Sequence, residues 1–156
     1  MKIDHVDIKI IDELSKDARL SMRELSKRVN LSSPSVTERV RRLENEGIIE
    51  GYTLKVNREK MGLTIQCLIE ITLKHAEYDR FKSAIQNCAN AVFCYRIAGK
   101  ACYIIKLTAL SMKEIEEFID SISSFTHTVT YFIFSEIQID ENLSEALNKN
   151  LQSEIN

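Results

Sequence analysis

Basic side chains that could bind an anionic polymer are concentrated in one part of the sequence. Residues 16–42 hold eight Lys and Arg against three acidic residues, although the whole chain carries a net charge of −2. A basic cluster attracts polyanions by Coulomb steering and by releasing counterions. The same charges would also suit a solvated helical surface, so the spacing of neighbouring residues has to decide. The basic residues are Lys16, Arg19, Arg23, Lys27, Arg28, Arg39, Arg41 and Arg42.

A helical repeat runs through the C-terminal part of this basic region. Val36, Val40 and Leu43 are spaced i, i+4 and i+7, which predicts a helix that buries these three side chains. A step of about 100° per residue places Glu38 and Arg41 on the outer face. Ser, Thr, Glu and Arg are residue types that bond base edges and phosphates in DNA. We predict base-edge contacts from Ser35, Thr37, Glu38 and Arg41, and phosphate contacts from Arg23, Lys27, Arg28, Ser33, Arg39 and Arg42.

Two shorter helices are predicted to precede this one. Asp4 can cap a first helix that ends near residues 17–18. Ser21 and Glu24 have the spacing of a capping box, in which each side chain accepts a hydrogen bond from the other residue's backbone N–H. A second helix of about two turns therefore begins after Ser21.

The connection to the third helix has the signals of a tight turn. Asn30 tolerates left-handed backbone geometry. Ser32 or Ser33 can cap the third helix, Pro34 fits its first turn, and Gly47 ends it. Two helices joined by a short turn and covered by a preceding helix form the helix-turn-helix arrangement, which places its second helix in the major groove.

Alternating β-favouring residues follow the third helix. Residues 48–56 predict a strand or a two-stranded ribbon that acts as a wing or as a connector. We therefore place a helix-turn-helix domain with a connecting β-ribbon at 1–60 and a second domain at 61–140. A tail at 141–156 has leucines at helical spacing, which weakly favours a C-terminal amphipathic helix.

The second domain has the element order of a ferredoxin-like fold, β-α-β-β-α-β, with both helices on one face of an antiparallel sheet. The fold class is therefore α+β. Apolar residues occupy both alternating sets in several strands, so the second face of the sheet needs a cover and we predict self-association. Strands are predicted at 64–73, 92–98, 101–109 and 129–139 around a tight hairpin at Gly99-Lys100, and helices at 76–86 and after a capping box formed by Ser111 and Glu114.

Motifs for catalysis, cofactor binding and metal binding are missing from the sequence. It contains no P-loop, G-x-G-x-x-G, H-E-x-x-H or G-x-S-x-G pattern. The four cysteines lack the spacing of metal ligands or a redox pair, which predicts free thiols. No apolar run reaches 18 residues, and no apolar segment of a secretory signal follows Met1. We predict a cytoplasmic, non-enzymatic protein without cofactor, metal or membrane partner.

With these elements in place, several stretches resemble the Lrp/AsnC family of bacterial and archaeal regulators. They are Asp4-x-x-Asp7-x-x-Ile10-Ile11, Ala18-Arg19-Leu20-Ser21, Glu24-Leu25, Leu31-Ser32-x-x-x-Val36-x-x-Arg39-Val40-x-x-Leu43-Glu44-x-x-Gly47-Ile48-Ile49, Gly62 and Gly99-x-x-x-Tyr103. The resemblance covers residues 4–139, and the LrpC-like branch is similar in further stretches. It implies a transcription regulator that binds double-stranded DNA and whose dimers assemble, often to octamers, through the C-terminal sheets.

The resemblance also implies an amino-acid effector site near the loop between the second and third strands. The family usually has an aspartate where this chain has Cys102. A neutral thiol cannot accept comparable charge-assisted hydrogen bonds from an ammonium group. We therefore expect a weak response or none to free amino acids, or a response to a ligand that lacks the amine. The implied effector residues are Gly99, Lys100, Ala101, Cys102, Tyr103, Thr128 and Thr130.

Two other functions stay open from the sequence. One is an architectural protein that bends or wraps DNA. It would differ from a regulator in the ratio of specific to non-specific DNA affinity and not in its charge. The other is a ferredoxin-like module, binding a small molecule or associated with an enzyme, whose N-terminal helices serve only assembly. That module would not need the basic residues of 16–42, which makes it the weakest of the three hypotheses.

Overall fold

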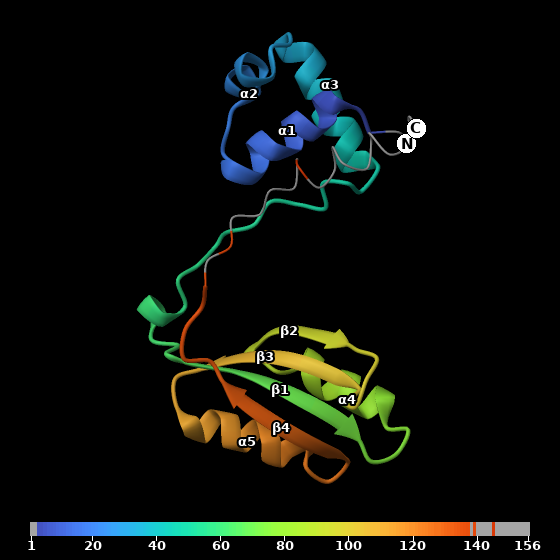
Figure 1. The fold of residues 1–156 in the computed structure, drawn as a ribbon, viewed down its shortest axis with the longest axis vertical. Helices are drawn as coiled ribbons and strands as arrows, with labels where there is room; N and C mark the ends of the chain where they lie inside the picture. The colour runs from blue at the N-terminus through green and yellow to red at the C-terminus, as the bar shows by residue number, and fades with distance from the viewer. Residues whose placement is uncertain (1–2, 138, 140–144, 146–156) are drawn as a thin grey trace. The chain divides into compact units, whose positions relative to one another are not determined.

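The computed structural model describes residues 3–137, 139 and 145, and Figure 1 shows its elements. Residues up to Leu54 belong to one compact unit, the N-terminal unit, and Lys55–Ile137 form a second, the C-terminal unit. The first unit contains α1 (His5–Lys16), α2 (Met22–Val29) and α3 (Ser33–Asn45). The second contains the 3-10 helix η1 (Glu59–Met61), β1 (Ile65–Leu73), α4 (Tyr78–Gln86), β2 (Ala91–Arg96), β3 (Tyr103–Ala109), α5 (Met112–Ile122) and β4 (Thr126–Phe132).

The first two helices begin at the residues that the sequence predicts. The Asp4 carboxylate accepts hydrogen bonds from the N–H groups of Val6 (2.9 Å) and Asp7 (2.8 Å), and the Asp7 carboxylate accepts the Asp4 N–H in return (3.1 Å). Ser21 and Glu24 form the predicted capping box, at 3.2 Å and 3.0 Å. These reciprocal bonds satisfy backbone donors that a helix start otherwise leaves unpaired.

The turn between α2 and α3 also follows the prediction. Asn30 ends α2 in the left-handed region, with φ 58°. The hydroxyl of Ser32 then accepts the Ser35 N–H at 3.3 Å, and Pro34 lies in the first turn of α3. A short, locally determined turn therefore sets the direction in which α3 leaves α2.

Gly47 ends α3 in the way its position suggests. Its φ is 67°, a conformation that residues with a Cβ rarely adopt. The Gly47 N–H donates to the carbonyl of Glu44 (3.0 Å) and the Ile48 N–H to that of Leu43 (2.9 Å), the hydrogen-bond pattern of a Schellman motif.

The three helices of the N-terminal unit share one apolar core. Val36, Val40 and Leu43 of α3 are buried, as the helical repeat predicts. Full burial of such a side chain contributes roughly 1.5–3 kcal/mol, so this stripe fixes which face of α3 turns inward. The buried members of the core are Ile10, Leu14, Leu20, Leu25, Val29, Val36, Val40 and Leu43.

The C-terminal unit is a four-stranded antiparallel sheet in the order β2-β3-β1-β4, with α4 and α5 on one face (Figure 1). Cys67, Ile69 and Ile71 of β1 point to that face and pack in one core with Phe81 of α4 and residues of α5. This is the ferredoxin-like arrangement, and the predicted α+β class is confirmed.

The second face of the sheet exposes aromatic and apolar side chains. Tyr95 of β2 is 61% exposed, and Val129 and Tyr131 of β4 are about half exposed. The rings of Phe93 and Tyr95 stack on this face with centroids 4.9 Å apart. These residues alternate along their strands with the ones that face the helices. Among the described residues, helices therefore cover the sheet on one side only.

The segment after α3 differs from the prediction. Residues 48–56 form no strand or ribbon; Tyr52, Leu54 and Val56 are at least half exposed on an extended backbone. The alternating pattern identified residues that favour a strand, but a strand also needs a hydrogen-bonding partner, and none of the described residues pairs with this segment. The predicted strand or ribbon is therefore not formed among the described residues, whereas the role of a connector stays open.

Three details of the C-terminal unit also correct the prediction. The connection between β2 and β3 spans residues 97–102 and closes with the Ile97 N–H on the Cys102 carbonyl (2.9 Å), so Gly99-Lys100 is no two-residue hairpin. Ser111 and Glu114 form no capping box. The Glu114 carboxylate instead accepts a hydrogen bond from the side-chain amide of Asn90 (2.8 Å). The last strand is Thr126–Phe132, not 129–139.

The predicted tail at 141–156 lies outside the described residues, apart from residue 145. Within the part of the chain that the structure describes, no helix has the length and apolar character to span a membrane. The four cysteines are free, with Cys67 buried and the others half-buried. Across those same residues, His, Cys, Asp and Glu side chains form no cluster of metal-ligand type.

Candidate nucleic-acid interface

The outer face of α3 presents the side chains predicted to contact base edges. Ser35, Glu38 and Arg41 are exposed, and Thr37 is half-buried. The Thr37 hydroxyl donates to the Ser33 carbonyl at 2.9 Å, so it is already used within the helix. Ser35 shares a hydrogen bond with the Ser32 hydroxyl (2.8 Å), so the first turn of the helix is ordered by its own side chains.

Arg41 is the free cation of this face. It is exposed, and it makes no hydrogen bond or ion pair with any residue in the described part of the chain. Glu38 is also exposed, and it has no partner among the described residues. A glutamate can accept a hydrogen bond from the amino group of cytosine. Both side chains can therefore bond an external partner without breaking an internal contact.

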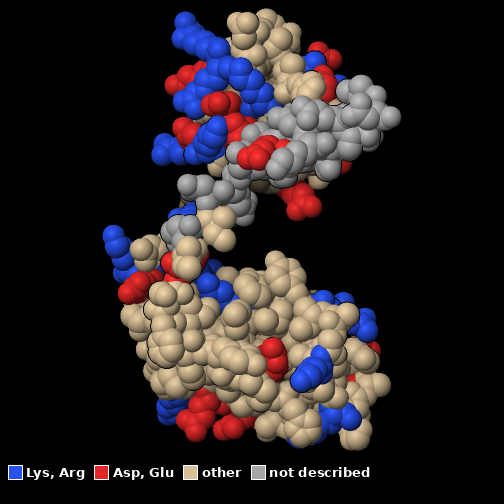
Figure 2. Space-filling view, viewed as in Figure 1, with Lys and Arg blue, Asp and Glu red and all other residues tan. Residues whose placement is uncertain are grey.

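Helix α2 supplies further exposed cations beside the turn. Arg23 and Lys27 are exposed, and Arg28 makes an ion pair with Glu13 of α1 at 3.0 Å. The Arg28 side chain remains 46% exposed, so this surface pair is weak and can be exchanged for a phosphate. Figure 2 shows Lys and Arg gathered along one side of the N-terminal unit, interleaved with carboxylates.

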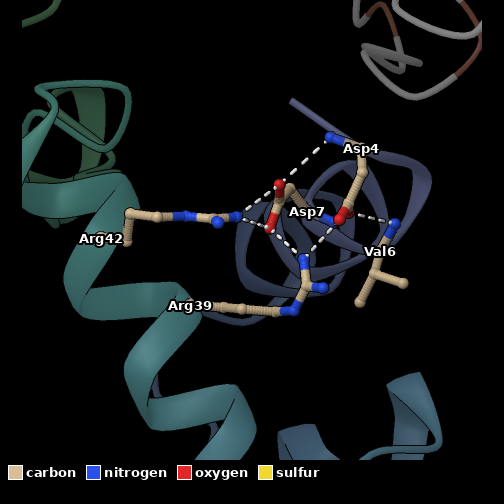
Figure 3. Close-up of polar contacts among 5 residues, drawn as sticks. All are labelled: Asp4, Val6, Asp7, Arg39 and Arg42. Atoms are coloured by element: carbon tan, nitrogen blue, oxygen red, sulfur yellow. Dashed lines mark hydrogen bonds and ion pairs between the residues drawn. The ribbon is translucent and has the colours of Figure 1, made fainter. Parts of the chain in front are cut away.

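Arg39 and Arg42 have a different environment from Arg41. Figure 3 shows both extending from α3 to the N-terminal turn of α1, where they meet Asp7. Arg39 Nη1 donates to Asp7 (2.8 Å) and Asp4 (2.7 Å), while Arg42 Nη2 lies 2.9 Å and 2.8 Å from the two oxygens of Asp7. The Asp7 side chain is 0% exposed, which makes it the buried centre of this ion-pair cluster.

The cluster also shifts the acidity of its outer members. Burial raises the pKa of the Asp4 carboxyl, but hydrogen bonds from Arg39 and from the N–H groups of Asp7 and Val6 together lower it below its usual value. Hydrogen bonds to Asp4 and Asp7 raise the pKa of the Arg39 guanidinium. The charged forms of these side chains are therefore the ones that fit the folded N-terminal unit.

Sequence reasoning missed Asp7 as a functional candidate. Its two arginine partners are 32 and 35 residues away, and a pattern of local spacing does not reveal such a pair. A signal was nevertheless present, since Asp7 stands at the N3 position of the Asp4 capping box while Arg39 and Arg42 lie one turn apart on one flank of the third helix. The phosphate contacts predicted for these two arginines are untested, and they would have to replace the ion pairs with Asp7.

The residues implied as an effector site are only partly brought together. The Cys102 N–H donates to the Ile71 carbonyl at 2.8 Å, and Ala101 is buried. Tyr103 stacks on Phe81 of α4 with ring centroids 4.6 Å apart. Within one chain the loop therefore closes on its own strands and on α4.

Thr128 and Thr130 lie across the sheet from that loop. In β4 they pair with Ile71 and Ile69 of β1, two strands away from Tyr103 in β3. Thr130 belongs instead to an open, mainly apolar groove of about 400 Å³ between α5 and β4. Its lining residues are Met112, Ile115, Glu116, Ile119, Thr130 and Phe132, and none comes from the loop.

Both halves of the chain match models of known protein families. Residues 3–50 match a family described as winged helix-turn-helix DNA-binding. Residues 66–143 match the Lrp/AsnC ligand binding domain. The first match covers the three helices that carry the cations, and the second covers the sheet and its two helices.

Individual relatives agree over nearly the whole chain. The chain is 56% identical over 137 residues to the HTH-type transcriptional regulator LrpC of Bacillus subtilis, covering 88% of this chain and 95% of that protein. The solved structure of B. subtilis LrpC superposes with a TM-score of 0.87 at 55% identity, over 90% of this chain and 100% of that one.

A more distant relative has the same architecture. A transcriptional regulator from Neisseria meningitidis, solved as a complex with L-methionine, has a TM-score of 0.82 at 26% identity over 88% of this chain and 94% of that one. The helix-turn-helix with its free outer cations, the one-sided sheet and these matches lead to one conclusion. The chain belongs to the Lrp/AsnC family and is a DNA-binding transcriptional regulator of that type.

Proposed function

We propose that this regulator reads its operator through the outer face of α3. Arg41 would donate to guanine, Glu38 would accept from cytosine, and the Thr37 methyl group would contact thymine, pairings that fit the major-groove pattern of each base. Ser35 at the N-terminal end of the helix completes the proposed base-edge set. The observation that carries this proposal is the exposed, unpaired state of Arg41 and Glu38 within the described chain.

Backbone contacts are proposed for the cations of α2 and the start of α3. Arg23, Lys27 and Arg28 would bind phosphates on one side of the groove. The Ser33 hydroxyl, in the first turn of α3, would bind a further phosphate. Each phosphate contact contributes about 0.9 to the slope of log K against log salt concentration. The ion pairs with Asp7 leave Arg39 and Arg42 out of the proposed phosphate set.

Assembly through the uncovered face of the sheet is part of the same proposal. Tyr95, Val129 and Tyr131 form an aromatic and apolar surface on the face opposite α4 and α5. A second copy can cover this face by two-fold symmetry, and the resulting dimers would associate further, up to an octamer. A dimer would carry two α3 helices, suited to half-sites about one helical turn, roughly 34 Å, apart.

A small-molecule effector would act on the assembled protein. Among the described residues, the groove that Thr130 lines between α5 and β4 includes none of the loop residues 99–103, so we place an effector site that joins the two between copies of the chain. Cys102 supplies no carboxylate for an α-ammonium group. We therefore propose a weak response to amino acids, or a preferred ligand that lacks the amine. The protein would act in the cytoplasm and catalyse no reaction.

An in vitro selection from randomised duplexes tests the proposed sequence reading. The full-length protein should enrich one motif and bind it at least about a thousandfold more tightly than random duplex at the same salt concentration. A ratio near one would refute sequence reading by α3 and favour the architectural alternative, in which DNA is wrapped with little preference. Lys9→Ala, an exposed α1 cation outside the proposed contacts, should leave the ratio unchanged.

A further inference from the structure

The three arginines of α3 fall into two groups. Arg41 is exposed and without a partner among the residues that the structure describes, whereas Arg39 and Arg42 both end on the carboxylate of Asp7 (Figure 3). Adjacent positions of one helix therefore differ in what their guanidinium groups can bind. The difference is imposed by a residue of another helix.

Asp7 is saturated by this arrangement. Its two oxygens accept the Asp4 N–H at 3.1 Å, Arg39 Nη1 at 2.8 Å and Arg42 Nη2 at 2.9 Å and 2.8 Å. A buried carboxylate that lost both guanidinium groups would be left as an unpaired charge, which is strongly unfavourable. The geometry thus ties the N-terminal turn of α1 to the middle of α3.

The flank of α3 held in this way is the one that also carries Ser35. Arg39 and Arg42 are four and seven residues after Ser35, so all three lie along the same side of the helix. Their side chains remain 28% and 44% exposed, which leaves them close to solvent. Without Asp7 they would be free to turn toward the phosphate backbone of a duplex bound by α3.

We propose that Asp7 is a positioning residue that keeps Arg39 and Arg42 away from the DNA backbone and thereby raises sequence discrimination. This inference rests on the proposed binding of DNA by α3. Phosphate contacts strengthen binding to every sequence equally, so two additional ones would raise non-specific affinity without adding information. Asp7 therefore limits the non-specific component of the DNA affinity while it fixes the orientation of α3.

The first test is Asp7→Asn in the full-length protein. Asparagine keeps the size of the side chain and a carbonyl acceptor for the Asp4 N–H, but it removes the charge that holds the arginines. Binding to a random duplex at about 0.1 M salt should tighten roughly tenfold, and the salt slope should steepen by about one to two. An unchanged slope in a folded Asp7→Asn protein would overturn the proposal.

The second test substitutes the arginines themselves. It tests the proposal even if the Asp7→Asn protein does not fold. Arg39→Gln and Arg42→Gln should each leave the salt slope of the otherwise unmodified protein unchanged, whereas the matched control Arg23→Gln should lower it by about 0.9. A reduction of about 0.9 in either variant would show a phosphate contact and refute the proposal. Adding both substitutions to Asp7→Asn should return the slope to its original value.

The proposed function and this inference fail in different measurements. If α3 does not bind DNA, Arg41→Ala leaves the binding of all duplexes unchanged. If α3 binds DNA but Asp7 plays no part in discrimination, Arg41→Ala weakens the selected site while Asp7→Asn leaves the ratio of specific to non-specific affinity intact.

Discussion

Arg41 and Arg42 are neighbours in α3, yet only Arg42 forms an ion pair with another residue of the described chain. Nη2 of Arg42 lies 2.8 Å from Oδ2 of Asp7, a fully buried carboxylate, while the exposed Arg41 has no partner in the described chain. A single turn of helix thus carries one guanidinium group that is available for the proposed base contact and one that joins α3 to α1.

Gly47→Ala should destabilise the N-terminal unit by about 1–2 kcal/mol. The φ of 67° is unfavourable for a residue with a Cβ, and no atom lies within 4 Å of the added methyl, so the cost comes from the backbone alone. Hydrogen exchange at the amides of α3 under native conditions measures the change. Gly47→Asn should lose less stability than Gly47→Ala, because asparagine tolerates this conformation. Equal protection in the alanine variant would argue against the left-handed end of α3.

Asp4 should make the N-terminal unit sensitive to acid. Its pKa is lowered in the folded state from the usual 3.8, so its contribution to stability is present above about pH 4 and is lost as the pH falls through the lower folded-state value. Asp4→Asn should therefore be less stable at pH 7 and should lose less stability between about pH 5 and pH 2. The Asp4 side chain is 49% exposed, so solvent screening keeps the effect small.

Urea unfolding at several pH values measures this contribution. Glu46→Gln, which removes an exposed carboxylate at the end of α3, serves as the control for a change in overall charge. If Asp4→Asn and the unmodified protein lost stability in parallel over the whole range, Asp4 would have no part in the acid response.

Val129→Asp should dissociate the dimer that we propose. The side chain is half exposed on the uncovered face of the sheet, and a carboxylate there would be buried without a partner when a second copy packs on it. Light scattering at micromolar concentration should show a shift toward monomer. Lys82→Asp, on the exposed side of α4, should leave the mass unchanged. Retention of the full oligomer by Val129→Asp would place the interface elsewhere.

Cys102→Asp should create or strengthen amino-acid binding. The backbone at this position is already fixed by the hydrogen bond from the Cys102 N–H to Ile71, so the substitution changes the side-chain chemistry more than the loop. Calorimetric titration with the twenty amino acids should give no sub-millimolar binding to the unmodified protein and measurable binding to the variant. Sub-millimolar binding to the unmodified protein would mean that a carboxylate at this position is dispensable.

The local features of the N-terminal unit could be predicted from the sequence because each depends on residues a few positions apart. The caps at Asp4, Ser21 and Ser32 are set by side chains that bond their own helix, and the turn at Asn30 by the left-handed backbone of that residue. The buried stripe of α3 follows from helical periodicity in the same way. The apolar patterns of the strands and helices of the C-terminal unit likewise predict its topology.

Features that depend on distant partners could not be predicted with the same methods. The alternating residues of 48–56 favour a strand, but no pattern in them states whether a partner strand exists. The pairing of Arg39 and Arg42 with Asp7 joins two helices, so local spacing did not predict it, while the phosphate role predicted for these arginines is untested. The effector residues were placed by resemblance, and the fold separates Thr130 from the loop at Cys102.

The binding profile of Arg41→Ala tests the central claim, that α3 reads bases through its one uncommitted arginine. Affinities are measured for the selected duplex and for each of its single-base substitutions, with the unmodified protein and with the variant at one salt concentration. We predict a loss of about 1–3 kcal/mol at the selected duplex and relaxed preference at one base pair only. An equal loss on every duplex, random sequence included, would make Arg41 a phosphate contact and contradict the account.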